Sequence, residues 1–329
     1  MIKPALKKLL LSLDPAVGEA SRWLNGERGT VRAICLHAMR TTGGTSPGVP
    51  PGFETDLGEL RTLVEQLLRK GYRFITPADL TRDLDPRGTY FMLTFDDGYF
   101  TASLAVELLK QYGVPVTLFI CSYFIERQMA HWSDALHRGC EKGAPDIKAR
   151  ATEHRLRATP QPEREQWLLD TFGRDSLVPL GDADRPLTSA ELKRLWRLGN
   201  VEIGNHSWSH ADLSRLSAAG IEDELERVQR YVHDLVGVRP RSMSFPYGFY
   251  NDTAIDVVRR MGFTSAFTTI PRRHSVASLT HGDFALVGRF ATWNHRRPFA
   301  RHVLRLRHGS LFSDRFLETS SSRPETSAS

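Results

Sequence analysis

The chain has 329 residues, which is enough to bury a large core as one barrel-sized domain or as two smaller ones. Its composition is that of an ordinary globular protein, and its net charge of +6 is mild. Three cysteines without a Cys-x-x-Cys pattern predict buried thiols in a reducing compartment, and no nucleic-acid recognition motif is present, so we expect no nucleic-acid partner.

The first 29 residues are expected to form an N-terminal helical extension. Three lysines precede the apolar run at residues 9–13, which Asp14 ends. This run is too short for a secretion signal and for a membrane span, so it predicts a cytoplasmic location. An alternative is a basic amphipathic helix that rests on the inner face of a membrane.

An amphipathic helix, a glycine and a short apolar strand follow one another five times along the chain. Thr188 and Glu191 form a capping-box pair at the start of one of these helices. Helices that alternate with apolar strands predict a parallel sheet, and the number of units favours an α/β barrel over a doubly wound sheet. The five helix and strand pairs lie at residues 57–68 and 72–75, 104–109 and 114–121, 188–199 and 201–203, 225–237 and 242–245, and 255–262 and 263–269.

Two segments interrupt this rhythm. Residues 126–185 are polar and rich in arginine, which predicts an inserted helical segment or lid within a main domain at residues 30–310. The insertion contains the chemically varied sequence His131-Trp132-Ser133-Asp134 near its start. Residues 311–329 are mostly Ser, Thr, Glu and Pro and are expected to be disordered.

The candidate functional residues all follow predicted strands. His37 comes after residues 31–36, and Asp96 and Asp97 come after residues 90–95. Farther along the chain, His206 follows residues 201–203, and Pro246 and Tyr247 follow residues 242–245. In parallel barrels the carboxyl ends of the strands converge on the active site. Four distant segments are therefore predicted to meet at one end of the barrel.

The residue types in this group point to a metal. Asp96 and Asp97 are adjacent at the end of an apolar strand, where burial and repulsion call for a compensating cation. His206 and His210 are four residues apart, which on a helical turn would place both on one face. One carboxylate and two imidazoles leave an open position on zinc, and the second carboxylate can act as a base. A simple Asp-Asp-Gly turn and ordinary helix-face histidines are the alternatives.

Taken together, these motifs resemble a known family. Residues 94–98 (Thr-Phe-Asp-Asp-Gly), 206–210 (His-Ser-Trp-Ser-His) and 245–248 (Phe-Pro-Tyr-Gly) are similar to the motifs of polysaccharide deacetylases, the NodB-homology group or carbohydrate esterase family four. The resemblance covers residues 31–290 and implies a distorted (β/α)7-type barrel. It also implies that Asp97, His206 and His210 bind a divalent metal, preferably Zn²⁺, and that Asp96 is the general base. The backbone N–H of Tyr247 would help to hold the oxyanion.

The resemblance leaves two alternative roles for Trp208 and for Arg289. Trp208 either stacks on a sugar ring or covers the metal site, and Pro246 and Tyr247 would line the substrate. Many relatives carry an arginine where this chain has Ser244; Arg289 either replaces it as the cation that orients Asp96 or forms a structural salt bridge.

Two histidines are candidates for the general acid of the reaction. The late Leu-x-x-His or Leu-x-His pattern of the family has no clear match; Leu279-Thr280-His281 has the letters but lies in a polar loop. His37, at a strand end, is therefore the preferred acid, with a hydrogen-bonded structural histidine as the alternative.

The resulting hypothesis is a hydrolase that removes N-acetyl groups from a glycan, an oligosaccharide or a lipid-linked sugar. The alternatives are a non-catalytic glycan- or membrane-binding relative, and a deformylase or other amidase that uses the same metal site. Residues 289–308 contain six arginines, three histidines and no acid. This stretch is either a solvated face or a contact for an anionic membrane surface or a lipid-linked phosphate.

Overall fold

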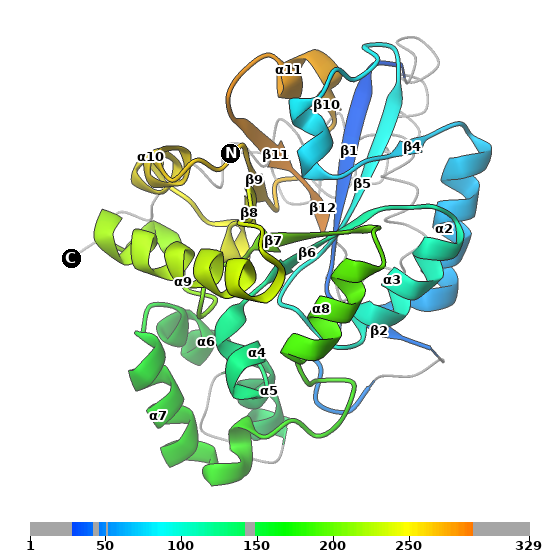
Figure 1. The fold of residues 1–329 in the computed structure, drawn as a ribbon. Coiled ribbons are helices and arrows are strands. Elements are labelled where there is room, and N and C mark those ends of the chain that lie inside the picture. Colours follow the sequence, from blue (N-terminus) through cyan, green and yellow to red (C-terminus); the bar gives the residue numbers. More distant parts are fainter. Residues whose placement is uncertain (1–27, 42–45, 51, 142–148, 292–329) are drawn as a thin grey trace, which may run out of the picture.

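The computed structural model describes residues 28–41, 46–50, 52–141 and 149–291. Seven parallel strands form the centre of a larger sheet, in an order that follows the sequence (Figure 1). They are β1 (Thr30–Leu36), β5 (Thr89–Phe95), β6 (Val116–Ile120), β7 (Val201–Asn205), β8 (Ser242–Ser244), β9 (Ser265–Thr268) and β11 (Ala285–Gly288).

The sheet nearly closes on itself. After β11, the chain continues as β12 (Phe290–Ala291), which pairs in parallel with β1 at the other end of the sheet. The predicted α/β barrel is therefore confirmed. The shorter strands are β4 (Arg73–Phe74) beside β5, β10 (His274–Ser275) antiparallel to β1, and the separate pair β2 (Ala38–Arg40) and β3 (Glu54–Asp56).

Helices cover the outside of the barrel because each has one apolar stripe. In α2, the buried residues Leu60, Leu63, Val64 and Leu67 recur at helical spacing and join a core cluster with the strands. The covering helices are α2 (Leu57–Arg69), α3 (Ala102–Gln111), α8 (Ser189–Arg197), α9 (Ala218–Val236) and α10 (Asp252–Arg260). The short helix α11 (Val276–Thr280) instead packs against the other face of the strands, in a cluster with Ala33 and Met92. Short 3-10 turns occur at Pro77–Thr81, Arg174–Leu177, Leu213–Arg215 and Pro246–Gly248.

The chain between β6 and β7 adds a group of helices at one end of the barrel, below the sheet in Figure 1. These are α4 (Ser122–Arg127), α5 (Trp132–Glu141), α6 (Ala149–Arg157) and α7 (Gln161–Phe172). They share an apolar cluster that includes Phe124, Trp132, Leu156 and Leu168. The boundaries of the insertion at residues 126–185 stay a prediction.

Residues 1–27, most of the expected N-terminal extension, and the expected tail at residues 311–329 lie outside the described residues. Among the helices that are described, none has both the length and the apolar character needed to cross a membrane. Cys35 and Cys121 are buried thiols, as the sequence predicted.

The capping box at the start of α8 forms as predicted. The Thr188 side chain accepts a hydrogen bond from Glu191 N at 3.2 Å, and the Glu191 carboxylate accepts one from Thr188 N at 2.8 Å. Both carboxylate oxygens of Glu191 also accept hydrogen bonds from Arg185, at 2.9 Å each. These bonds, chiefly those from Arg185, lower the pKa of Glu191 from 4.5 to about 2.

We expect Glu191→Gln to lower the free energy of unfolding at pH 7 by about 1 kcal/mol, since it weakens the capping box and a partly exposed ion pair. The folded-state pKa lies below the unfolded one, so this stabilisation is complete above the unfolded value of 4.5 and is lost as the pH falls toward about 2. Urea unfolding of both proteins between pH 7 and pH 2 measures the difference. The exposed pair Glu107–Arg194 provides the control, Glu107→Gln, which should change little. If the difference in the free energy of unfolding between the wild type and Glu191→Gln did not shrink as the pH falls, the stabilising role of the Glu191 carboxylate would be contradicted.

Candidate functional site

The predicted site residues meet at the carboxyl ends of the barrel strands. His37 follows β1, Asp96 and Asp97 follow β5, His206 follows β7, and Arg289 lies between β11 and β12. All five side chains are buried. The barrel therefore brings together residues that are up to 252 positions apart in the sequence (289 minus 37).

Asp97 is the centre of the group. Its Oδ1 atom lies 3.4 Å from His206 Nε2, 3.4 Å from His210 Nε2 and 3.9 Å from His131 Nε2. Its other oxygen, Oδ2, lies 4.0 Å from His37 Nε2. The backbone of Asp97 has a φ of 71°, in the left-handed region that non-glycine residues rarely adopt. The turn after β5 is thus fixed in the conformation that directs Asp97 among the imidazoles.

His206 and His210 converge through a loop and not through a helix. The expectation that their spacing places them on one face of a helical turn was wrong, because no helix follows β7 at these positions. Ser207 and His210 instead have positive φ angles of 61° and 56°. The Asn205 side chain accepts a hydrogen bond from Ser207 N at 2.9 Å, which holds the first of these turns.

The ring of His206 has a defined orientation. Its Nδ1 atom lies 2.8 Å from the backbone carbonyl oxygen of Ser244, which can only accept a hydrogen bond. Nδ1 therefore carries the proton in the neutral ring, and Nε2 presents its lone pair toward Asp97. A histidine that ligates a metal is usually held in this way by a hydrogen bond from its other nitrogen.

Asp96 is paired with a buried arginine and also lies near His206, whose Nε2 is 3.6 Å from Asp96 Oδ2. Arg289 donates to Asp96 Oδ1 from Nη1 and to Oδ2 from Nη2, at 2.7 Å each, in a bidentate pair. Ser244, at the position where many relatives have arginine, bridges the two: its hydroxyl accepts from Arg289 Nη2 at 2.7 Å and lies 3.2 Å from Asp96 Oδ2. Thr94 Oγ1 accepts a further bond from Arg289 Nη1 at 2.8 Å.

The charge of Arg289 decides the ionisation of Asp96. Burial by itself would raise the pKa of Asp96, but the positive charges of Arg289 and His206 and the hydrogen bonds from Arg289 outweigh it and lower the pKa to about 2. Asp96 is therefore ionised at neutral pH. Because Arg289 is fully buried, it does not belong to an exposed basic stretch, which corrects the expectation for residue 289; residues 292–308 lie outside the described residues.

The site has the donors that a metal requires, and Asp96 and Asp97 outweigh burial and raise the pKa of His206 above 6.5. Ligand atoms of Asp97, His206 and His210 all lie within 4.8 Å of one another. Asp97 Oδ1 is buried and accepts no hydrogen bond from any described residue. Burial by itself would raise the pKa of Asp97, but the histidines around it, in their protonated forms, outweigh burial and hold that pKa well below its usual value. Burial keeps the pKa of His210 well below 6.5, so its ring is neutral and can ligate. Because a buried, ionised oxygen is costly without a partner, the Asp97 Oδ1 atom is suited to binding a cation.

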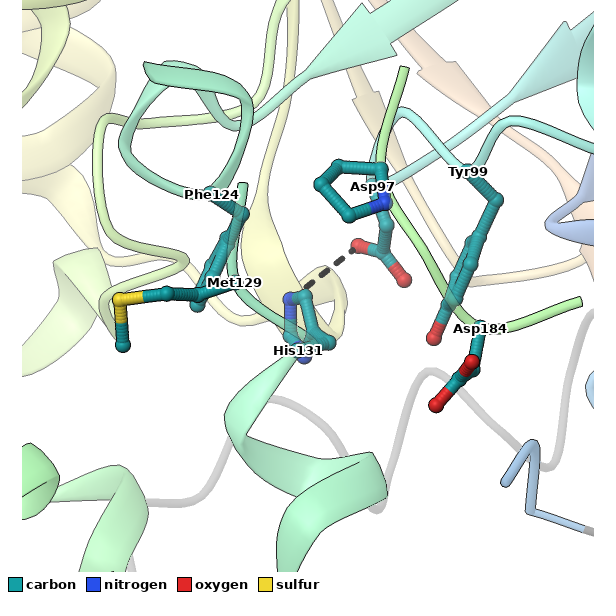
Figure 2. Close-up of a pocket in the computed structure, with 7 residues that line it drawn as sticks. Asp97, Tyr99, Phe124, Met129, His131 and Asp184 are labelled. Atoms are coloured by element: carbon teal, nitrogen blue, oxygen red, sulfur yellow. Dashed lines mark ion pairs between the residues drawn. The ribbon is translucent and has the colours of Figure 1, made fainter. Parts of the chain in front are cut away.

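His131 is a member of this group that the sequence analysis did not assign. It precedes α5 in the inserted segment, and its ring points toward Asp97 within a narrow pocket also lined by Tyr99, Phe124 and Asp184 (Figure 2). Burial lowers the pKa of His131 to about 4. The only sequence signal was the polar run at residues 131–134, which has no fixed spacing to the other motifs.

Trp208 packs against side chains of two helices, α4 and α9. Its ring meets that of Tyr123 edge-on at 4.7 Å between centroids, and the guanidinium of Arg227 lies 4.1 Å from its centroid. Through these contacts Trp208 supports the loop after β7. Its predicted role in stacking on a sugar stays a prediction.

The turn after β8 lies beside the metal candidates. Tyr247 has a φ of 61°, its ring lies 4.5 Å from that of His210, and its hydroxyl donates to the His210 carbonyl oxygen at 3.2 Å. Pro246 is buried in the same turn. A Cβ atom on the next residue, Gly248, would lie 2.1 Å from Thr269 Oγ1, so only glycine fits there.

The remaining histidine candidate is placed elsewhere. His281 ends α11, is exposed, and its Nδ1 lies 2.7 Å from the carbonyl oxygen of Ala277 in the same helix. His37 packs edge-on against Phe53 at 5.0 Å and lies beside Asp97. Of the two histidines considered as the general acid, only His37 is therefore near the site.

Fold and site together define an α/β-barrel protein with an acidic and imidazole-rich centre at its strand ends. The family model described as polysaccharide deacetylase matches residues 83–266, more than half of the chain. The chain therefore belongs to the polysaccharide deacetylase family, whose members are hydrolases of N-acetyl amide bonds.

Individual relatives are distant. The putative polysaccharide deacetylase YxkH of Bacillus subtilis is 20% identical over 285 residues, which cover 85% of this chain and 78% of that protein. An uncharacterized 30.6 kDa protein of Geobacillus stearothermophilus is 23% identical over 195 residues, 56% of this chain, and the chain spans only 48% of its length. The solved structure of the Streptococcus pyogenes deacetylase PplD has a TM-score of 0.54 at 16% identity, covering 80% of this chain and 92% of that one, and shows the same fold.

We expect Arg289→Gln to lower the free energy of unfolding by about 3 to 5 kcal/mol, because it leaves the buried Asp96 carboxylate without its cation. Urea unfolding measures the loss. The control is Arg260→Gln, which removes an exposed pair with Glu222 and should cost less than about 1 kcal/mol. Equal effects of the two substitutions would show that Arg289 does not compensate a buried charge.

Proposed function

We propose that this chain is a metal-dependent hydrolase that removes N-acetyl groups from a glycan, an oligosaccharide or a lipid-linked sugar. Asp97, His206 and His210 would hold the metal, and Zn²⁺ suits one carboxylate with two imidazoles. The observation that carries the proposal is the pairing of this donor set with a second carboxylate, Asp96, that is ionised and held separately by Arg289.

A bound metal would supply Lewis-acid chemistry, which polarises an acyl oxygen and lowers the pKa of water. Asp96 would then accept the proton of the attacking water. With a pKa of about 2, Asp96 is a weak base, so its contribution rests on a fixed position and full ionisation. The bidentate contact with Arg289 supplies that fixed position.

Two further residues complete the proposed reaction. We assign to His37 the proton for the departing amine, which requires the protonated ring; burial lowers the pKa of His37, so that form is the minor one at neutral pH. The backbone N–H of Tyr247 is proposed as a donor to the oxyanion. Its left-handed backbone and the tight contact at Gly248 support this role, since they hold the turn rigidly beside His210. Pro246 and Trp208 are proposed to contact substrate.

Arg289 weakens the argument for one of the two alternative functions, and an analysis of the product tests the other. A non-catalytic relative was suggested by the serine at position 244, where an arginine is expected, but Arg289 provides a cation to Asp96 from another strand end. A deformylase or other amidase would use the same residues in the same roles. Mass analysis of the released acid, acetate against formate, distinguishes these two activities.

We expect Asp96→Asn to bind Zn²⁺ as the wild type does but to release acetate about 100- to 10,000-fold more slowly, because the amide cannot accept a proton. Acetate release from a panel of N-acetylated glycans, with Zn²⁺ added, measures the rate, and chelation should abolish it. The control is Asp256→Asn, which changes an exposed aspartate on α10. Full activity in Asp96→Asn would remove Asp96 as the base, whereas activity that survives complete metal removal would contradict metal dependence.

A lipid-linked or membrane-bound substrate is supported by the basic sequence at residues 296–308. Replacing Arg296, Arg297, Arg301 and Arg305 by glutamine should weaken binding to vesicles that contain anionic lipid by at least about 10-fold, and salt should weaken it in the wild type. Four exposed arginines elsewhere form a charge-matched control: Arg69, Arg82, Arg230 and Arg260. Equal loss in both variants would indicate that net charge alone determines binding.

A further inference from the structure

The sequence His131-Trp132-Ser133-Asp134 has no role in the function proposed above, yet the fold inserts it into the site. His131 Nε2 lies 3.9 Å from Asp97 Oδ1, the same oxygen that His206 and His210 approach. The segment is anchored firmly, since Trp132 and Asp134 are almost fully buried. Three imidazoles from two separate segments thus converge on one carboxylate oxygen.

Hydrogen bonds within the motif set the proton position on His131. Its Nδ1 lies 3.0 Å from Ser133 Oγ, and the Ser133 hydroxyl donates to Asp134 Oδ1 at 3.2 Å. Asp134 is held in turn by the Tyr99 hydroxyl, which donates to its Oδ2 at 2.8 Å. In the arrangement in which the Ser133 hydroxyl donates to Asp134, Ser133 accepts from His131 and Nδ1 carries the ring proton. The lone pair of the neutral ring is then on Nε2.

That lone pair faces an electron-rich atom. Neither His131 Nε2 nor Asp97 Oδ1 has a hydrogen-bond partner among the described residues, and both are buried. A lone pair directed at a carboxylate oxygen at this distance is repulsive unless a cation lies between them. Ring contacts with Phe124 at 4.5 Å and with His210 at 4.7 Å hold the imidazole in this orientation.

We propose that His131 is a fourth protein donor to the metal, beside Asp97, His206 and His210, so that the metal would take a fifth ligand when it binds the acyl oxygen. This inference rests on the proposed metal site and adds to it a ligand from the inserted segment. His131 is held by Ser133 as His206 is held by the Ser244 carbonyl, so both rings are prepared for ligation through Nε2. Metal binding would therefore tie α5 to the barrel, and the insertion would be part of the site and not only a cover.

The test is the affinity of the full-length chain for Zn²⁺, measured by competition with a zinc-binding dye after the metal has been stripped. His131→Ala should weaken binding by more than about 100-fold, beyond the 10- to 100-fold typical of losing a residue that only orients a ligand. His131→Gln keeps the size of the side chain and should also bind weakly, which covers the case in which the alanine variant does not fold. The matched control is His137→Ala on the same helix, where the histidine contacts Glu141 and not the site.

The visible spectrum of the Co²⁺-loaded protein gives a second measurement, since loss of a nitrogen donor changes the band shape and intensity. An altered spectrum in His131→Gln, with an unchanged one in His137→Ala, supports ligation. If wild type and both His131 variants bind Zn²⁺ equally and give the same Co²⁺ spectrum, His131 is not a ligand. If the wild type itself binds neither metal, the proposed function fails as a whole, which separates the two hypotheses.

Discussion

The structure depends on how two adjacent buried carboxylates at the end of β5 are compensated. Each loses its water, and an unpaired charge in such a place costs several kcal/mol. The chain gives them different partners: Asp96 receives a bidentate arginine, and Asp97 receives a ring of imidazoles. The positive φ at Asp97 turns it away from the direction of the strand, so that neighbouring residues face different surroundings. One pair of acids thereby acquires two chemical roles.

The residue that compensates the negative charge of Asp96 lies where the barrel closes. Arg289 is the one residue between β11, which pairs with β9, and β12, which pairs with β1. Its backbone N–H and its Nε both donate to the Thr268 carbonyl oxygen at 3.2 Å, at the end of β9. The arginine that compensates Asp96 is therefore held at the junction between the two strands that close the barrel.

Local signals in the sequence identify the strand ends, the capping box at Thr188 and the acidic and imidazole residues themselves. They do not identify contacts that depend on the closed barrel. Arg289 and Asp96 are separated by 193 positions, and the sequence alone left a salt bridge and an orienting cation equally open. The spacing of His206 and His210 suggested a helix, because left-handed residues such as Ser207 leave no periodic signal. His131 lies in an insertion, where distance along the chain says nothing about distance in space.

Ser244 shows how one position can change without loss of the local charge balance. The family resemblance leads to the expectation of an arginine there, on the strand next to the metal candidates. In this chain the cation comes from Arg289, and the small Ser244 leaves room for it while its hydroxyl joins Arg289 to Asp96. An arginine at both positions would put two buried cations against one carboxylate, which burial strongly disfavours. Serine at position 244 and arginine at position 289 are therefore best understood as one arrangement, in which each residue is suited to the other.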